Sequence, residues 1–210
     1  MSFRHPTAIV RAVDALRKDL LSEEGPQIST VRNYNFAILP YPPDEEFTLR
    51  AAIHDLSGKL REAGWTTGTV VLHTLLLARL RAEGSDVLEA IIRREKSLAN
   101  AADGSRGLRM LKERVVNLVD KPDGIATDVV RGIEAILATS EKPERTVIFL
   151  GRLGGLYPFL RSSSLLKHIA GRTQNVPVVL LYPGTVDGES GLRFMGVLQA
   201  DRDYRPRIYR

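Results

Sequence analysis

Two short apolar runs, Val147–Leu150 and Val178–Leu181, mark the centre of the pattern of hydrophobic and polar positions. Neither run alternates with polar residues, which is typical of a strand buried on both faces of a parallel sheet. Between the runs, Leu165, Leu166 and Ile169 have the spacing of one apolar helical face. The pattern therefore predicts a strand–helix–strand unit, whose crossover is almost always right-handed.

Cap-forming and turn-forming residues bound this unit. Ser162–Ser164 are the expected N-cap of the helix, and Gly171 is its expected end. Each strand is expected to run into a glycine-containing loop, at Gly151–Gly155 after the first strand and at Pro183 and Gly184 after the second. Ligands of open parallel sheets lie beyond the carboxyl ends of the strands. These loops are therefore the expected ligand edge.

Periodic apolar positions predict the remaining elements. Helices are expected at residues 7–21, from Asp44 as N-cap to Gly64, from Leu75 to Leu80 and at 125–137; strands are expected at 35–39, 67–72, 192–195 and 207–209. Pro40–Pro43 are expected to stop the strand at 35–39, because proline lacks the ladder donor and restricts the residue before it.

Residues 86–120 differ in character from the rest of the chain. They contain two helical patterns separated by Asp103 and Gly104, and basic residues exceed acidic ones; the basic residues are Arg93, Arg94, Lys96, Arg106, Arg109, Lys112 and Arg114. The simplest interpretation is a solvated helical insertion. A helical pair that docks a partner is the alternative.

Apolar strands that alternate with helices predict an α/β fold with a mainly parallel sheet flanked by helices. We expect residues 1–33 to form an N-terminal helix and its connection. Residues 34–210 are expected to form a single α/β domain with the helical insertion at about 86–120. The order of the strands in the sheet does not follow from this pattern.

Composition limits the choice of compartment and partner. The 210 residues contain no cysteine and no apolar run of membrane-spanning length, and 43% of them are hydrophobic. We therefore expect a cytoplasmic protein that does not enter a membrane. The net charge of +5 mildly favours an anionic partner.

The usual catalytic and nucleotide-binding motifs are missing from the sequence. It contains no G-x-x-x-x-G-K-[ST], no G-x-G-x-x-G and no G-x-S-x-G string. The histidines lack the spacing of metal ligands and are interpreted as surface or satisfied core residues: His5, His54, His73 and His168. The sequence therefore predicts a protein that is not an enzyme and needs no metal or cofactor.

One stretch combines loop glycines with an excess of positive charge. No Asp or Glu occurs between Glu144 and Asp187, so backbone N–H groups and arginines there could hold an anion or a partner. The candidate binding residues are Gly151, Arg152, Gly154, Gly155, Arg161, Tyr182, Pro183, Gly184 and Arg193. Arg161 is expected first to fix the glycine loop and second to face a partner. The alternative is that the glycines serve only a tight turn.

The C-terminal segment is a candidate for nucleic-acid binding. It combines basic and aromatic side chains at Arg202, Tyr204, Arg205 and Arg207, and such pairs can hold phosphates and stack on bases. The alternative interpretation is an edge strand that uses arginine to stay soluble.

These residues together resemble the BrxB family, a small component of bacterial BREX (bacteriophage exclusion) defence systems. The resemblance is strongest at residues 147–169 and 176–198, in the segments Pro158–Arg161, Tyr182–Gly184 and Leu192–Phe194. A weaker similarity covers Tyr41–Arg50. The tail from Asp201 to Arg207 departs from the family pattern, and residues 86–120 match little of it.

The resemblance implies a non-enzymatic assembly protein in a phage-defence system. Its implied associates are the alkaline-phosphatase-like, ATPase and DNA-methyltransferase components. The implied fold is similar to a P-loop NTPase core that lacks its phosphate loop. Direct DNA binding, a degenerate nucleotide site and pairing with a second copy remain open alternatives.

Overall fold

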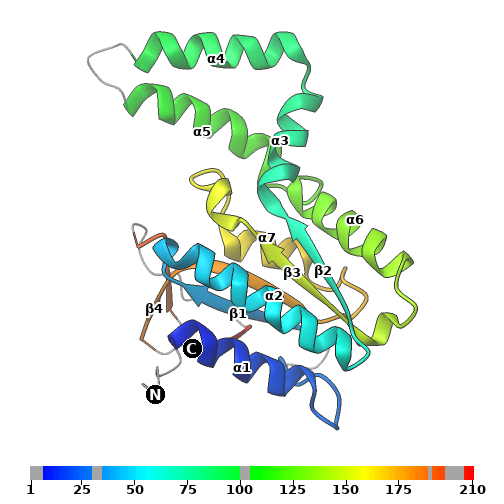
Figure 1. The fold of residues 1–210 in the computed structure, drawn as a ribbon. Helices are drawn as coiled ribbons and strands as arrows, with labels where there is room; N and C mark the ends of the chain where they lie inside the picture. The colour runs from blue at the N-terminus through cyan, green and yellow to red at the C-terminus, as the bar shows by residue number, and fades with distance from the viewer. Residues whose placement is uncertain (1–6, 30–34, 100–104, 189–190, 197–205) are drawn as a thin grey trace.

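A computed structural model describes residues 7–29, 35–99, 105–188, 191–196 and 206–210 (Figure 1). The helices are α1 (Ala8–Leu20), α2 (Glu46–Glu62), α3 (Leu72–Ala82), α4 (Ser85–Ala99), α5 (Ser105–Val119), α6 (Ile125–Ala138) and α7 (Ser162–Ile169). The strands are β1 (Phe36–Tyr41), β2 (Thr66–Val71), β3 (Thr146–Gly151), β4 (Val178–Asp187), β5 (Gly191–Phe194) and β6 (Arg207–Ile208). Among the described residues, no helix is long and apolar enough to cross a membrane.

The strands form one sheet in the order β2-β3-β4-β1-β6, with β5 added beside β4. All neighbours on the main path pair in parallel, and only β5 is antiparallel. This arrangement confirms the predicted α/β class with a mainly parallel sheet. It also supplies the strand order, which the sequence pattern could not give.

Both faces of the sheet are covered by helices, which explains the unbroken apolar runs. Helices α1 and α2 cover one face, where Leu16 and Leu56 share a buried cluster with Phe149 (Figure 1). Helices α6 and α7 cover the other, where Ile133 and Leu165 share a cluster with neighbouring strand residues. Every residue of β3 is therefore buried.

Strand β1 continues through Pro40 to Tyr41, so the prediction that the proline segment stops it at Leu39 is wrong. The carbonyl of Ile38 accepts a hydrogen bond from Tyr209 N–H. Since backbone groups alternate sides along a strand, Pro40 also faces the β6 side. Strand β6 pairs only with Ala37 and Ile38. The missing proline donor therefore costs no ladder bond, and the strand continues.

Two predicted helix caps are also wrong. Asp44 lies inside a short 3₁₀ turn, Pro43–Glu45, and α2 follows it without a side-chain cap. Ser162 opens α7 itself, whose N-cap residue is Arg161, again without a side-chain cap. Ser164 donates instead to Asp120. Asp44 is thus part of a neighbouring turn, and Ser164 binds a residue distant in the sequence. Neither side chain caps the helix for which the local sequence predicted it.

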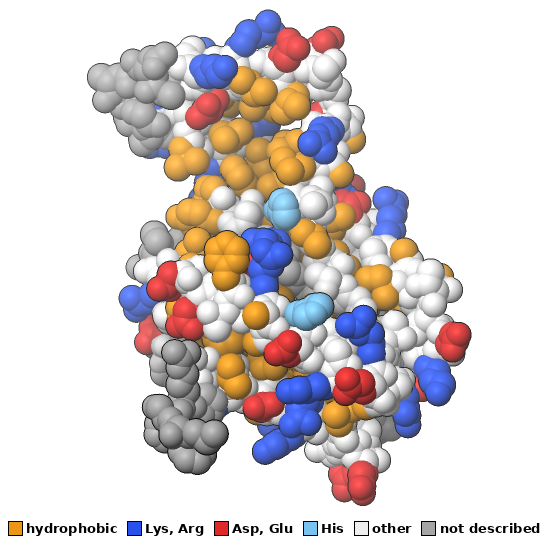
Figure 2. All heavy atoms as spheres, viewed as in Figure 1, with side chains coloured by type: hydrophobic (Ala, Val, Ile, Leu, Met, Phe, Trp, Pro, Cys, Tyr) orange, Lys and Arg blue, Asp and Glu red, His pale blue; other side chains and the backbone are white. Residues whose placement is uncertain are grey.

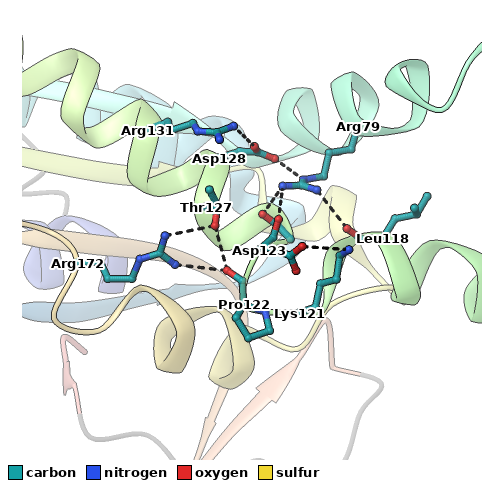
Figure 3. Close-up of polar contacts among 10 residues, drawn as sticks. Arg79, Leu118, Lys121, Pro122, Asp123, Thr127, Asp128, Arg131 and Arg172 are labelled. Atoms are coloured by element: carbon teal, nitrogen blue, oxygen red, sulfur yellow. Dashed lines mark hydrogen bonds and ion pairs between the residues drawn. The ribbon is translucent and has the colours of Figure 1, made fainter.

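Helices α4 and α5 confirm the two helical patterns predicted for this region, and they project from the body as a hairpin (Figure 1). Arg79 on α3 fixes its root, where α5 turns into α6 (Figure 3). The guanidinium donates to the Asp128 carboxylate and to the carbonyls of Leu118, Asp123 and Gly124. Hydrogen bonds to carbonyls from both sides of the turn hold the hairpin root to the body.

Candidate functional site

The three predicted β4 residues are structural rather than part of a ligand loop. Strand β4 runs on past Tyr182, Pro183 and Gly184 to pair with β5, so the predicted loop is absent there. The Tyr182 ring packs edge-on against Phe194, with ring centres 5.4 Å apart. A Cβ on Gly184 would lie 2.3 Å from the Arg193 carbonyl oxygen. The glycine therefore permits the close approach of two strands.

The glycine loop after β3 contains a tight turn, which agrees with the alternative that its glycines serve a turn. Gly151 is the last residue of β3, and a 3₁₀ turn, Leu153–Leu156, follows. A Cβ on Gly155 would lie 2.8 Å from Cβ of His73, whereas one on Gly154 would meet only ordinary contacts. Gly155 thus lets the loop pack against the start of α3.

The predicted basic residues have different surroundings. Arg193 is exposed and pairs with Asp187 at 3.3 Å on the β4–β5 arm. Arg161 is also exposed, and its side chain has no hydrogen bond or ion pair within the described part of the chain. No contact therefore supports the predicted role of Arg161 in fixing the glycine loop.

The described end of the tail is bound to the body. Arg207 forms an ion pair with Asp19 at 2.9 Å, donates to the Gln27 carbonyl and lies over the Tyr209 ring. Tyr209 O–H also donates to Asp19. Arg207 therefore holds the tail against α1 and the connection after it. The other predicted nucleic-acid contacts, Arg202, Tyr204 and Arg205, lie outside the described residues.

A groove of about 450 Å³ opens at the carboxyl ends of β1, β2 and β3, between α2 and edge strand β2. Its polar lining comes from Tyr41, Glu46, Arg50, His54, Ser57, Thr69, His73 and Arg152. Its apolar lining includes Leu49, Ile53, Val71 and Leu181. Basic and histidine side chains surround a hollow on this face in Figure 2. A groove thus lies at the carboxyl ends of the strands, on the α2 side of the sheet.

Three side chains that line the groove are linked by polar contacts. Tyr41 O–H donates to the Glu46 carboxylate, and Arg152 pairs with the same carboxylate at 3.1 Å. Burial, followed by the hydrogen bond to Glu46, raises the pKa of Tyr41, so the phenol stays neutral and keeps donating. Arg152 has a left-handed backbone with φ of 61°, which is uncommon for a residue other than glycine.

His73 corrects the interpretation of the histidines as surface or satisfied core residues. Its Nδ1 atom is buried and has no hydrogen-bond partner among the described residues. Most buried polar atoms are paired, so such an orphan requires an explanation. His54, by contrast, is exposed on α2.

Sequence reasoning missed the α2 contribution to this groove. Glu46, Arg50 and His54 follow each other at four-residue intervals, which places them on one helix face directly after a buried strand. That spacing was the available signal.

The hairpin presents a second candidate surface. Leu77, Ile92 and Leu108, on α3, α4 and α5, are 43%, 43% and 53% exposed. Hydrophobic side chains gather over the hairpin and the neck below it in Figure 2. The basic side chains listed above for this region form no ion pair with any described residue. Within the described part of the chain, no three His, Asp or Glu residues gather as metal ligands.

Comparison with known proteins identifies the family. The BREX protein BrxB family matches residues 69–208, which is more than half of the chain. A BREX protein BrxB from Bacillus cereus (strain H3081.97) is 36% identical over 59 residues, covering 28% of this chain and 30% of that protein. The match thus spans less than a third of the relative's length. No solved structure matches the chain significantly.

The family match confirms the resemblance found in the sequence and defines the residues that it covers. The match begins at Thr69, so it leaves out the weaker similarity at Tyr41–Arg50. It includes both helices of the hairpin, which the motifs alone did not connect to the family. Because the match runs from edge strand β2 through the hairpin, the glycine loop and the β4–β5 arm to β6, this chain belongs to the BrxB family.

Proposed function

We propose that this protein is a non-enzymatic assembly component of a BREX phage-defence system and binds another protein of the system through the α4–α5 hairpin. The observation that carries the proposal is a projecting element that exposes apolar side chains together with basic side chains that have no ion pair among the described residues. Exposed apolar groups rimmed by polar residues mark interaction sites. Family membership supplies the defence context.

The charge of the hairpin defines the chemistry of the partner. Its seven basic residues outnumber the acidic residues Asp86, Glu89, Glu95, Asp103 and Glu113. A complementary surface therefore has an apolar centre with an acidic rim. The partner belongs to the alkaline-phosphatase-like, ATPase or methyltransferase components of the system, in the cytoplasm.

The anchoring of the hairpin also suits a docking element. Arg79 and its carbonyl acceptors hold the root in one orientation, so the surface is presented without a large ordering cost on binding.

Affinity purification of the tagged chain, expressed together with its neighbouring defence genes, tests the proposal. We expect a defence component to copurify, and Ile92→Ser combined with Leu108→Ser to lower its recovery at least tenfold. Phe47→Ser is the matched control, because Phe47 is a large apolar side chain on the body that is 79% exposed. Repeated recovery of the chain alone, or equal losses for both variants, would contradict the proposal.

A second candidate function is direct nucleic-acid binding by the same unpaired basic side chains. Of the C-terminal candidates, Arg207 is paired with Asp19, and the other three lie outside the described residues. Binding to duplex DNA should weaken with salt: for each phosphate contact, log K should fall by about 0.9 for every tenfold rise in salt concentration. Gel shifts at low salt with Arg106→Gln and Arg109→Gln measure this, and the absence of any shift for the parent chain would remove the candidate.

A further inference from the structure

We infer that the groove between α2 and β2 is a binding site for a small phosphate-bearing molecule. This site is separate from the hairpin, and the inference does not depend on the proposed assembly function. The groove volume of about 450 Å³ falls within the range of small-molecule sites. Its position at the carboxyl ends of parallel strands is the usual one for a ligand of an open α/β sheet.

The charges in the groove favour an anion. Arg50 and Arg152 line it together with two histidines, and Glu46 is the only carboxylate among its lining residues. Glu46 already accepts from Tyr41 and pairs with Arg152. Arg50 forms no ion pair with any described residue. Its guanidinium therefore retains free donors for a phosphate, which arginine binds with a planar fork.

The donors come from separate elements and converge on one space. Arg50 and His54 lie one helical turn apart on α2, Arg152 follows β3 and His73 begins α3. The left-handed backbone of Arg152 is uncommon, and such conformations persist where the surroundings hold them. The ion pair with Glu46 holds the guanidinium at the groove. The site is therefore largely formed before a ligand arrives.

The orphan nitrogen of His73 supplies independent support. Nδ1 is buried without a described partner, and an unmade buried hydrogen bond costs free energy. Gly155 lies directly against the Cβ of His73, so the histidine packs beside the loop that carries Arg152. Because His73 also lines the groove, we assign the missing partner to a phosphate oxygen bound at this end.

The site differs from a Walker phosphate loop in its location. In that motif the phosphates lie at the start of the helix after a strand. Here the β1–α2 connection contains Asp44 and Glu45, whose carboxylates repel phosphate. The groove extends further along α2, where Leu49, Ile53 and Leu181 provide an apolar floor for the remainder of the molecule.

Calorimetric titrations of the full chain test this inference, with inorganic phosphate, AMP and adenosine as probes at one ionic strength set with NaCl. We expect phosphate and AMP to bind and AMP to bind more tightly, because the apolar floor adds contacts. Adenosine should bind at least tenfold more weakly than AMP. Arg50→Gln should weaken AMP binding at least tenfold, since it removes charged hydrogen bonds.

Arg81→Gln is the matched control, because Arg81 is an exposed arginine outside the groove that forms no ion pair with any described residue. It should leave AMP binding unchanged. The inference is overturned by no binding of phosphate and AMP, by equal affinity for AMP and adenosine, or by equal effects of the two arginine variants. None of these outcomes alters the recovery of a defence component in the purification experiment, so the two proposals fail separately.

Discussion

The root and the tip of the α4–α5 hairpin use the same residue types for opposite purposes. At the root, Arg79 meets a carboxylate and backbone carbonyls, and Val115 and Val119 are buried in the main core. Toward the tip, Arg106 and Arg109 form no ion pair with any described residue, and Leu108 is exposed. Satisfied groups contribute to folding, whereas open ones add little to it. The contacts of the root therefore contribute to stability, whereas the proposed recognition role falls to the tip.

Removal of the root arginine should have the largest effect on folding. Arg79→Ala removes the hydrogen bonds that the guanidinium donates to Asp128 and to the carbonyls of the turn (Figure 3). Because the pair is partly exposed, we expect a loss of about 2–3 kcal/mol, below the full cost of breaking a buried pair. Urea denaturation measures the change in the free energy of unfolding.

Arg131→Ala is the control for this change. Arg131 also pairs with Asp128, at 3.7 Å, but its side chain is 73% exposed. Exposed pairs contribute little, so we expect a loss within about 0.5 kcal/mol. Equal losses for the two variants would remove the distinction between a clamped root and an ordinary surface.

Truncation of aliphatic side chains along α5 should lower the free energy of unfolding more at the root than at the tip. Both losses should be smaller than that of Arg79→Ala. Val115→Ala removes methyl groups from a buried position and should cost about 1–2 kcal/mol, in proportion to the cavity left behind. Leu108→Ala removes more atoms from an exposed position and should cost less than about 0.5 kcal/mol. Denaturation of both variants checks the order, and a larger loss at Leu108 would show that the tip is packed.

The sequence was most informative where burial dictates the residue type. The runs at Val147–Leu150 and Val178–Leu181 identified two central strands, and the periodicity of residues 86–120 identified both hairpin helices. Each signal is local, because a strand buried on both faces or an amphipathic helix shows its surroundings in its own composition.

The errors arose where the outcome depends on a distant segment. Pro40 fits within β1 because β6 is short, and Ser164 is not a cap because Asp120 accepts its hydroxyl. The groove was missed for the same reason: Arg152 meets Glu46 across more than a hundred positions of the chain. Such pairings depend on strand order, which the periodicity of a single sequence does not contain.

The smallest predicted effect is also the most specific. Replacement of a basic residue by Gln should change the free energy of unfolding in opposite directions on α5 and at the hairpin root. Lys112 follows Arg109 by one helical turn on α5, and like charges at this spacing destabilise a helix by about 0.2–0.5 kcal/mol. Lys112→Gln should therefore raise the free energy of unfolding by about that amount at low salt. Arg131→Gln at the root should lower it slightly, since it removes the pair with Asp128. Denaturation in 0.05 M and 1 M NaCl measures both changes, and the two should converge at high salt, where exposed charges are screened within about 3 Å. If both variants change stability in the same direction at low salt, the basic side chains of the tip are compensated, and the tip has no unpaired positive charge to offer a partner.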